Sequence, residues 1–300
     1  MAKETAPLWD LYDFARQLDI PVTDLMNARL PDVRSYREVR IPKHAGGMRI
    51  LHIPSPAMMK LQRTMHRRIF RHLPVSPAVH GSVEKRSNVT NARVHKNAQA
   101  VYILDLADAF TQATPERIVA AMGAFNATPG AKEFLAHLLT FEGSIPQGSP
   151  TSNTVWNMVC KELDAILEKF AKEYGLIYTR YTDELTFSHP KHISHEVRDR
   201  IKATVAQAGF IINRKKTRYF HVRHGALCVT GVNIANGRLG LSQKTIDKIR
   251  GLVHRAGLDN SIPRSTVMSL VGYARYVNGG QIPKRLSEPL GRFLYFRRHD

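Results

Sequence analysis

The sequence has very little cysteine, and the cysteine it has forms no recognisable pair. Cys160 and Cys228 are its two cysteines, far apart and without metal-ligand spacing. Their isolation excludes a disulfide framework and indicates a reducing compartment. The N-terminus lacks the apolar core of a signal peptide, and no run approaches the roughly 20 apolar residues of a membrane helix. We therefore expect a cytoplasmic protein without membrane association.

Acidic residues are scarce relative to basic ones. Lysine and arginine total 44 against 25 aspartates and glutamates, which gives a formal net charge of +19. The positive charge is spread along the whole chain among apolar and aromatic residues. Such an excess indicates a polyanionic partner, and nucleic acid is the usual one.

The hydrophobic pattern predicts mixed strands and helices, followed by a helical C-terminal part. Strands are expected at 39–41, 48–53, 101–106, 176–182, 185–188, 217–222 and 227–232. Helices are expected at 9–18, 56–70, 115–122, 131–139, 151–174, 194–208, 242–256, 263–277 and 283–295. We therefore predict an α+β fold with three parts, 1–30, 31–235 and 236–300.

Two segments end apolar strands in carboxylates. Asp105 and Asp108 follow one apolar run, and Asp183 and Glu184 lie at an expected hairpin turn. If the two strands are neighbours, Asp105 and Asp183 converge and repel each other unless cations lie between them. Mg²⁺ prefers oxygen ligands, and two ions about 3.5–4 Å apart would stabilise an in-line displacement. Either segment alone could be an ordinary acidic turn.

Four motifs resemble those of reverse transcriptases, and they follow one another along the chain in the order of that family. Asp105-Leu-Ala-Asp108-Ala-Phe110 is similar to the first carboxylate motif, and Tyr181-Thr-Asp183-Glu184 to Y-x-D-D. Between them, segment 146–152 resembles P-Q-G-S/A-P-x-S, and segment 209–217 resembles the later G-F-x-x-N-x-x-K-T. The resemblance covers about 36–231. It implies an RNA-directed DNA polymerase with a right-hand fold, in which an N-terminal helical extension (1–30) precedes fingers and palm (31–235, an antiparallel sheet plus helices) and a helical thumb (236–300).

The resemblance implies a role for each matched position. The catalytic carboxylates would be Asp105, Asp183 and Glu184, and these three with Leu106 would bind two Mg²⁺ ions, or Mn²⁺ in their place. The incoming deoxynucleotide would be bound by Lys43, Arg49, Asp108, Ala109, Phe110, Gln147 and Lys216. Phe110 would pack under the sugar and exclude a 2′-hydroxyl, and Lys216 would protonate the pyrophosphate. For Arg49 and Lys216, a general phosphate or surface contact remains an alternative.

One position departs from the family pattern. Glu184 stands where the family has aspartate, and its extra methylene moves the carboxylate by roughly 1 Å, a misplacement that can lower a rate about 10²-fold. We expect activity nonetheless, because Asp105 and Asp183, which would carry most of the metal binding, match the pattern.

Two shorter segments resemble retron reverse transcriptases in particular. Asn91-Ala-Arg-Val-His95 is similar to their N-A-x-x-H motif, and Val229-Thr230-Gly231 to their V-T-G motif. The resemblance implies that Asn91, His95, Val229, Thr230 and Gly231 bind RNA. It also implies a structured non-coding RNA partner, primed from an internal guanosine 2′-hydroxyl and copied into branched RNA–DNA (multicopy single-stranded DNA). Anti-phage defence, usually with an effector protein, is implied as well.

The expected thumb is basic. From 244 to 300, eleven lysines and arginines stand against four acidic residues. Basic helices suit RNA, which is held through shape, phosphates and 2′-hydroxyls. Two alternatives stay open. One is another bacterial reverse transcriptase, from a group II intron or an abortive-infection system. The other is an RNA-binding scaffold on a polymerase fold, disabled by Glu184.

Overall fold

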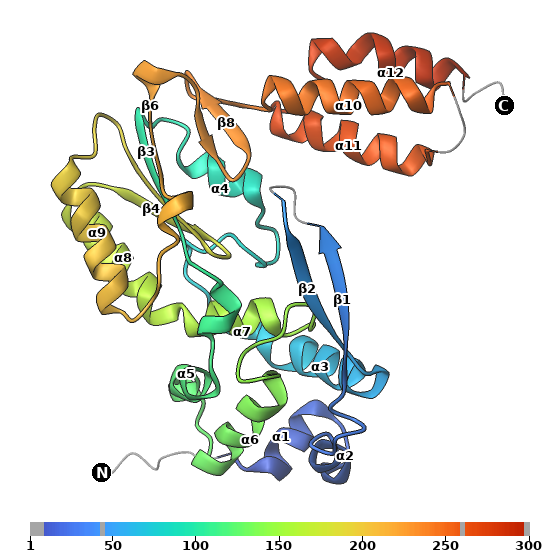
Figure 1. The fold of residues 1–300 in the computed structure, drawn as a ribbon, viewed down its shortest axis with the longest axis vertical. Coiled ribbons are helices and arrows are strands. Elements are labelled where there is room, and N and C mark those ends of the chain that lie inside the picture. Colours follow the sequence, from blue (N-terminus) through green and yellow to red (C-terminus); the bar gives the residue numbers. More distant parts are fainter. Residues whose placement is uncertain (1–8, 43–45, 259–261, 297–300) are drawn as a thin grey trace, which may run out of the picture. The chain divides into compact units, whose positions relative to one another are not determined.

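The computed structural model describes residues 9–42, 46–258 and 262–296. Figure 1 shows the helices and strands of this 300-residue chain. The chain divides into two compact units, each assembled from separate stretches. Unit 1 comprises Met1–Val83, Leu106–Lys169 and Lys202–Asn213, and unit 2 comprises Glu84–Asp105, Phe170–Ile201 and Arg214–Asp300. The three-part division expected from the sequence is a different partition and stays a prediction.

Unit 1 contains a long hairpin and most of the short helices. Strands β1 (Tyr36–Pro42) and β2 (Met48–Pro54) pair antiparallel along their whole length, which confirms the predicted hairpin. The helices of this unit are α1 (Leu11–Leu18), α2 (Val22–Asn27), α3 (Pro56–Arg68), η1 (Phe70–His72), η2 (Ala109–Gln112), α5 (Pro115–Ala121), η3 (Met122–Ala124), α6 (Pro129–Leu139) and α7 (Ser152–Val159).

Three of these helices start with the same two-residue signal. Ser55, Thr114 and Thr128 each accept a backbone N–H of the first turn with the side-chain oxygen, and each is followed by proline. The hydroxyl satisfies a donor that the helix cannot, and proline has the helical φ without needing a hydrogen bond. The sequence therefore sets the starts of α3, α5 and α6 locally.

Unit 2 is built on a four-stranded antiparallel sheet with the order β4-β5-β3-β6. Its strands are β3 (Ala100–Asp105), β4 (Ile177–Tyr181), β5 (Glu184–His189) and β6 (Arg218–His221). The central strand β3 is buried from Ala100 to Leu104 and only its last residue is partly exposed. An apolar run that ends in a carboxylate thus delivers that carboxylate to the edge of the core.

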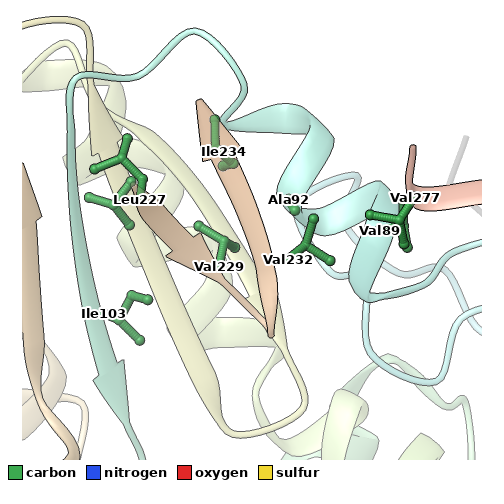
Figure 2. Close-up of a cluster of buried hydrophobic side chains, with 9 residues drawn as sticks. Val89, Ala92, Ile103, Leu227, Val229, Val232, Ile234 and Val277 are labelled. Atoms are coloured by element: carbon green, nitrogen blue, oxygen red, sulfur yellow. The ribbon is translucent and has the colours of Figure 1, made fainter. Parts of the chain in front are cut away.

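A second, three-stranded sheet of unit 2 packs beside helix α4 (Asn88–Val94). It consists of β7 (Leu227–Val229), β8 (Val232–Ala235) and β9 (Arg238–Gly240). Figure 2 shows the shared core, in which Val89 and Ala92 of α4 meet Val229 and Val232 of the hairpin. A single strand was expected at 227–232, and that prediction was wrong because the chain reverses within it.

The C-terminal part of unit 2 is a three-helix module, as predicted. Helices α10 (Gln243–Ala256), α11 (Arg264–Val277) and α12 (Lys284–Phe296) share one apolar core centred on Val253, Val267 and Phe293. Each helix repeats apolar residues at three- and four-residue intervals, which is why the sequence indicated them well. Among the described residues, no helix has the length and apolarity needed to cross a bilayer.

Two helices contain a boundary between the units, which are α8 (Lys161–Glu173) and α9 (His195–Gln207). The short helices η4 (Arg214–Lys216) and η5 (Val222–His224) belong to unit 2. The helix expected at 151–174 is divided at Cys160, which ends α7 before α8 begins. Because the N–H of Cys160 still bonds to Trp156 and its C=O to Asp164, the extent of the prediction was right and only the continuity was wrong.

Candidate active site

Three carboxylates lie at one end of the four-stranded sheet. Strands β3 and β5 pair antiparallel, and their register sets Asp105 opposite Glu184. Asp183 directly precedes Glu184, in the two-residue loop between β4 and β5. The prediction that the two strands are neighbours is confirmed. The turn itself was misplaced by one residue, because Glu184 is the first residue of β5 and the loop is Thr182–Asp183.

The β4–β5 loop has a backbone conformation that its residues disfavour. Thr182 has a φ of 56°, in the left-handed region where a β-branched side chain is strained. Arg180 is fully buried in β4 and donates from Nη1 to the C=O of Thr182 at 2.9 Å. Since a buried guanidinium is costly without hydrogen bonds, this contact holds the loop in place. Asp183 therefore sits on a well-supported turn.

Two basic side chains reach the carboxylates. Lys216 Nζ lies 2.9 and 3.1 Å from the two carboxylate oxygens of Asp105. Arg218 donates from Nη2 to Glu184 Oε2 at 3.2 Å, and the backbone N–H of Thr230 donates to Glu184 Oε1 at 3.2 Å. The side chains of Asp105 and Glu184 are only 15% and 16% exposed, whereas Lys216 and Arg218 are 59% and 50% exposed. Mostly buried carboxylates thus form ion pairs with basic side chains that are themselves largely exposed to solvent.

Burial raises the pKa of the Glu184 carboxyl above its ordinary value. Arg218 and the N–H of Thr230 lower this pKa, and the carboxylates of Asp183 and Asp105 raise it again. The carboxylates of Asp183 and Asp105 are therefore both close enough to repel the negative charge of Glu184. Negative charge is therefore concentrated at the end of β3 and β5.

The donor chemistry of this site suits a divalent cation. Asp105, Asp183 and Glu184 supply hard oxygen ligands of the kind Mg²⁺ prefers. The ion pairs with Lys216 and Arg218 show that the carboxylates attract positive charge. No group of three or more His, Cys, Asp or Glu side chains in the described ranges has the arrangement of a ready-formed metal centre. The carboxylates would therefore exchange basic partners for metal ions on binding, and their ligand roles are a proposal.

The turn after β3 is tied to the 209–213 segment within unit 1. Leu106 forms an isolated antiparallel bridge with Ile212. Gln112 Nε2 donates to the C=O of Ile211 at 3.3 Å, and the N–H of Ile211 donates to Gln112 Oε1 at 2.8 Å. Two motifs about one hundred residues apart in the sequence are therefore fastened to each other.

Three residues expected to bind the nucleotide lie at the beginning of η2, with Asp108 as its N-cap and Ala109 and Phe110 as its first two residues. Asp108 has a φ of 41°, and its C=O accepts both the N–H and the hydroxyl of Thr111, at 2.8 and 2.7 Å. Ala109 is buried and Phe110 is partly exposed. The ring of Phe110 lies 6.2 Å, centroid to centroid, from the fully buried ring of Trp156. The ring of Phe110 is thus packed near Trp156 and is partly exposed to solvent.

A row of neighbouring aromatic rings extends from Phe110 through Trp156 to Phe210 within unit 1. The centroid of Trp156 lies 6.0 Å from that of Phe210, and Arg117 stacks over Phe210 at 4.3 Å. Arg117 also donates to the C=O of Gly209 at 2.6 Å. Gly209 has a φ of 78°, which favours glycine, and a Cβ there would lie 2.7 Å from Arg117 Nη2 and displace that side chain.

Two further expected nucleotide contacts lie along β2. Arg49 is exposed in that strand, and the C=O of Gln147 accepts the N–H of His52 at 2.7 Å. Gly148 has a φ of 119°, and a Cβ there would lie 3.0 Å from the carbonyl oxygen of His52. The P-Q-G segment therefore packs directly on β2. Lys43 lies outside the described residues.

Asn91 and His95 are fully buried, at 0% exposure each. Asn91 lies in α4 and His95 caps its C-terminus. The Nδ1 atom of His95 lies 2.6 Å from Ser188 Oγ, and its Nε2 atom lies 2.7 Å from Thr179 Oγ1. Direct RNA contact by these two side chains does not fit this structure. His95 instead fastens α4 to β5 and β4 through these two contacts, and Asn91 is a buried residue of the same helix.

The V-T-G triplet forms a tight turn at the active site. Val229 pairs with Val232, and the two-residue loop Thr230–Gly231 has φ angles of 46° and 80°. Positive φ at both loop residues is characteristic of the type I′ turn, which suits the twist of a hairpin. Val229 is fully buried, and the N–H of Thr230 points to Glu184.

Sequence reasoning missed three residues of this site, which are Arg180, Arg218 and Asn88. Arg218 is the first residue of β6 and lies two positions after Lys216 of η4, so the signal available for it was the basic segment 214–218. For Arg180, the available signal was a basic residue inside an expected strand, directly before the Y-x-D-D motif. Asn88 gave no signal, because its partners are distant in the sequence.

The family model for reverse transcriptase (RNA-dependent DNA polymerase) matches residues 41–254, which include both carboxylate segments. Fold and site together thus define a template-directed nucleic-acid polymerase. Retron Mx65 reverse transcriptase of Myxococcus xanthus is 34% identical over 97% of this chain and 74% of its own length. Retron Ec86 reverse transcriptase of Escherichia coli is 30% identical over 69% of this chain and 65% of its own length. The chain belongs to the retron reverse transcriptases.

Solved structures show the same architecture. A telomerase from Candida albicans, in complex with a fragment of telomeric RNA, has a TM-score of 0.54 at 9% identity and covers 89% of this chain and 57% of its own. The apo telomerase of Candida tropicalis has a TM-score of 0.51 at 9% identity, over 88% of this chain and 56% of its own. At such identities the likeness is one of fold alone. It confirms the expected α+β polymerase fold.

Proposed function

We propose that this chain copies part of a structured non-coding RNA into DNA, starting from the 2′-hydroxyl of an internal guanosine. The product would be a branched RNA–DNA hybrid, multicopy single-stranded DNA. The observation that carries the proposal is the convergence of Asp105, Asp183 and Glu184 at one end of the sheet in a chain of the retron family. A role in anti-phage defence, with an effector protein as a further partner, is part of the same proposal.

The reaction is an in-line displacement at the α-phosphorus of a deoxynucleoside triphosphate. The primer hydroxyl gives its proton to solvent water, its oxygen forms the new P–O bond, and pyrophosphate leaves as the bond to the bridging oxygen breaks. Asp105 and Asp183 would hold both Mg²⁺ ions, with the backbone of Leu106 and with Glu184 as further ligands. When bound, the ions would activate the attacking oxygen and neutralise charge on the leaving group.

Lys216 is suited to supply the proton that the pyrophosphate takes up. Its ammonium group already lies 2.9 Å from Asp105, so its side chain reaches the catalytic end of the sheet. At 59% exposure it has room to turn from the carboxylate to a triphosphate. A lysine ammonium in hydrogen-bond reach of a leaving oxygen is a general acid.

Phe110 would select deoxynucleotides by exclusion. Its ring has Trp156 behind it and is partly exposed on the other side, so it cannot retreat to make room for a 2′-hydroxyl. The backbone N–H groups of Asp108 and Ala109, together with Arg49 and Gln147, would bind the rest of the nucleotide.

The thumb helices offer a basic groove for RNA phosphates. Helices α10 and α12 line it with Arg250, His254, Lys284, Arg285, Glu288 and Arg292. Phosphate contacts dominate nucleic-acid affinity, and A-form RNA is held mainly through its backbone. Together with the net charge of +19, this groove supports RNA as the partner.

Primer extension on poly(rA) with oligo(dT), dTTP and Mg²⁺ tests the proposal. We expect extension by the unmodified protein and none by Asp183→Asn, because the variant loses a ligand charge at the metal site. Binding of RNA, measured by fluorescence anisotropy, should change less than twofold. Asp24→Asn, an exposed aspartate in α2, is the matched control and should extend normally.

The same assay decides between the proposal and its alternatives. Tight RNA binding without any extension by the unmodified protein would support an RNA-binding scaffold. Extension without a branched product would support another type of bacterial reverse transcriptase. Sequencing the nucleic acid that co-purifies with the protein detects the branched RNA–DNA species directly.

A further inference from the structure

Thr230 connects the active site to two other elements of unit 2. Its backbone N–H donates to Glu184 Oε1 at 3.2 Å. Its hydroxyl donates to the C=O of Asn88 at 3.0 Å, and its own C=O accepts from Asn88 Nδ2 at 3.2 Å. All three hydrogen-bonding groups of this residue are therefore engaged, and they join the β7–β8 turn to β5 and to the first residue of α4.

Asn88 extends this connection to the thumb. Its Nδ2 atom also donates to the hydroxyl of Tyr273 in α11 at 2.8 Å. One amide group thus bonds both Thr230 and Tyr273. An uninterrupted chain of hydrogen bonds runs from the catalytic carboxylate of Glu184 through Thr230 and Asn88 to a thumb helix.

The backbone conformation of Thr230 indicates that its side-chain contacts, and not its turn preference, explain a threonine at this position. Its φ of 46° lies in the left-handed region, where a β-branched side chain is a strained choice. Asparagine, aspartate and glycine are the usual residues at such a turn position. Threonine there is explained by its hydroxyl, which reaches Asn88. Strain of this kind persists only where the surroundings over-determine the conformation.

The packing around the turn makes it a firm anchor. Val229 and Val232, which flank the loop, are fully buried against Val89 of α4, and Val277 at the end of α11 joins the same cluster (Figure 2). Tyr273 packs against this cluster as well. The position of the Thr230 N–H is therefore fixed by an apolar core that α4, the hairpin and the thumb helix all share.

We propose that Thr230 is a positioning residue for DNA synthesis, which holds the carboxylate of Glu184 in place and links it through Asn88 to Tyr273 of the thumb. The proposal rests on the proposed polymerase function. It assigns to the V-T-G triplet a task at the catalytic end of the sheet, apart from any contact with RNA. It also explains how a glutamate serves where the family pattern has aspartate, because its longer side chain reaches the turn.

Four variants test the link. Thr230→Val removes the hydroxyl and keeps the shape, and Thr230→Ser restores the hydroxyl. Tyr273→Phe removes only the acceptor of Asn88. Tyr276→Phe is the matched control, since it lies one turn further along α11, is 45% exposed and is stacked by Arg93 through its ring. Two properties are measured, which are hydrogen exchange of the Thr230 amide and the kinetics of dTTP incorporation on poly(rA)–oligo(dT).

Thr230→Val and Tyr273→Phe should each speed exchange of the Thr230 amide by about two- to tenfold, the effect of one hydrogen bond. Each should lower kcat by a similar factor while the KM for dTTP stays within twofold. Thr230→Ser and Tyr276→Phe should match the unmodified protein in both properties.

Unchanged amide exchange and kcat in Tyr273→Phe would overturn the proposal. So would an equal loss of kcat and thermal stability in Thr230→Val and Thr230→Ser, because that pattern marks a merely structural residue. If the unmodified protein makes no DNA, the polymerase function fails. Amide exchange in the same four variants, which needs no synthesis, still decides whether Thr230 depends on Tyr273.

Discussion

At the scale of single residues, the site differs from a bare cluster of acids. Each of Asp105 and Glu184 has a basic side chain bound to it, and Asp183 stands on a loop that Arg180 supports. The sequence motifs identify the acids. The G-F-x-x-N-x-x-K-T motif also identifies Lys216, but no motif reveals Arg218, which reaches Glu184 only after β6 pairs with β3. Residues that carry chemistry were thus predictable, and the ion pairs that they form were not.

Phe110, the residue proposed to exclude ribonucleotides, gives the sharpest test at this scale. Phe110→Val should raise incorporation of ribonucleotides relative to deoxynucleotides by about 10- to 100-fold, because the removed ring leaves room for a hydroxyl. Single-nucleotide incorporation, as the ratio of kcat/KM for dTTP and UTP, measures the change. Phe110→Tyr keeps the ring and should keep the selectivity. An unchanged ratio in Phe110→Val would remove Phe110 from the sugar site.

His95 shows how a family motif can be structural. His95→Leu should lower the free energy of unfolding by about 2–4 kcal/mol, because it leaves the buried hydroxyls of Ser188 and Thr179 without their partner. Urea denaturation measures this loss. His72→Leu, at an exposed histidine, should change stability by about 0.5 kcal/mol or less. Equal stability of the two variants would contradict the buried role of His95.

At the scale of elements, the sequence indicated strands and helices well wherever the periodicity is local. The three C-terminal helices and β2 match their predicted ranges closely, whereas β1 covers 36–42 against a prediction of 39–41. Two of the errors, at Glu184 and at Thr230–Gly231, have a common cause. In both cases a threonine, Thr182 or Thr230, adopts a left-handed conformation that its own preference opposes. The nearby Arg180 supports the first turn, and Asn88, which is distant in the sequence, supports the second.

The contact between the P-Q-G segment and β2 is a prediction about elements. Gly148→Ala should destabilise the fold by about 1–3 kcal/mol, since φ is 119° and the new methyl group would press on the backbone of His52. Because Gln147 is attached to the same strand, the KM for dTTP should also rise. Thermal unfolding and steady-state kinetics measure the two effects. Gly130→Ala, which meets nothing within 4 Å, should be neutral, and the claim fails if both variants behave alike.

At the scale of the whole molecule, the net charge of +19 must be matched by a polyanion. Each phosphate neutralised by lysine or arginine releases counterions, so the logarithm of the binding constant falls linearly with that of the salt concentration. A merely solubilising charge would produce little such dependence. The groove lined by α10 and α12 separates these cases, because Arg250 and Lys284 line it, are exposed and form no ion pair within the described residues.

Arg250→Gln and Lys284→Gln should each reduce the slope of this salt dependence by about 0.7–1, the effect of one lost phosphate contact. Fluorescence anisotropy of a labelled RNA stem-loop between low and physiological salt measures the slope. Lys169→Gln removes the same charge from an exposed position in α8 and should leave the slope unchanged. If all three substitutions lower the slope equally, the positive charge acts over the whole surface, and α10 and α12 have no particular part in holding RNA.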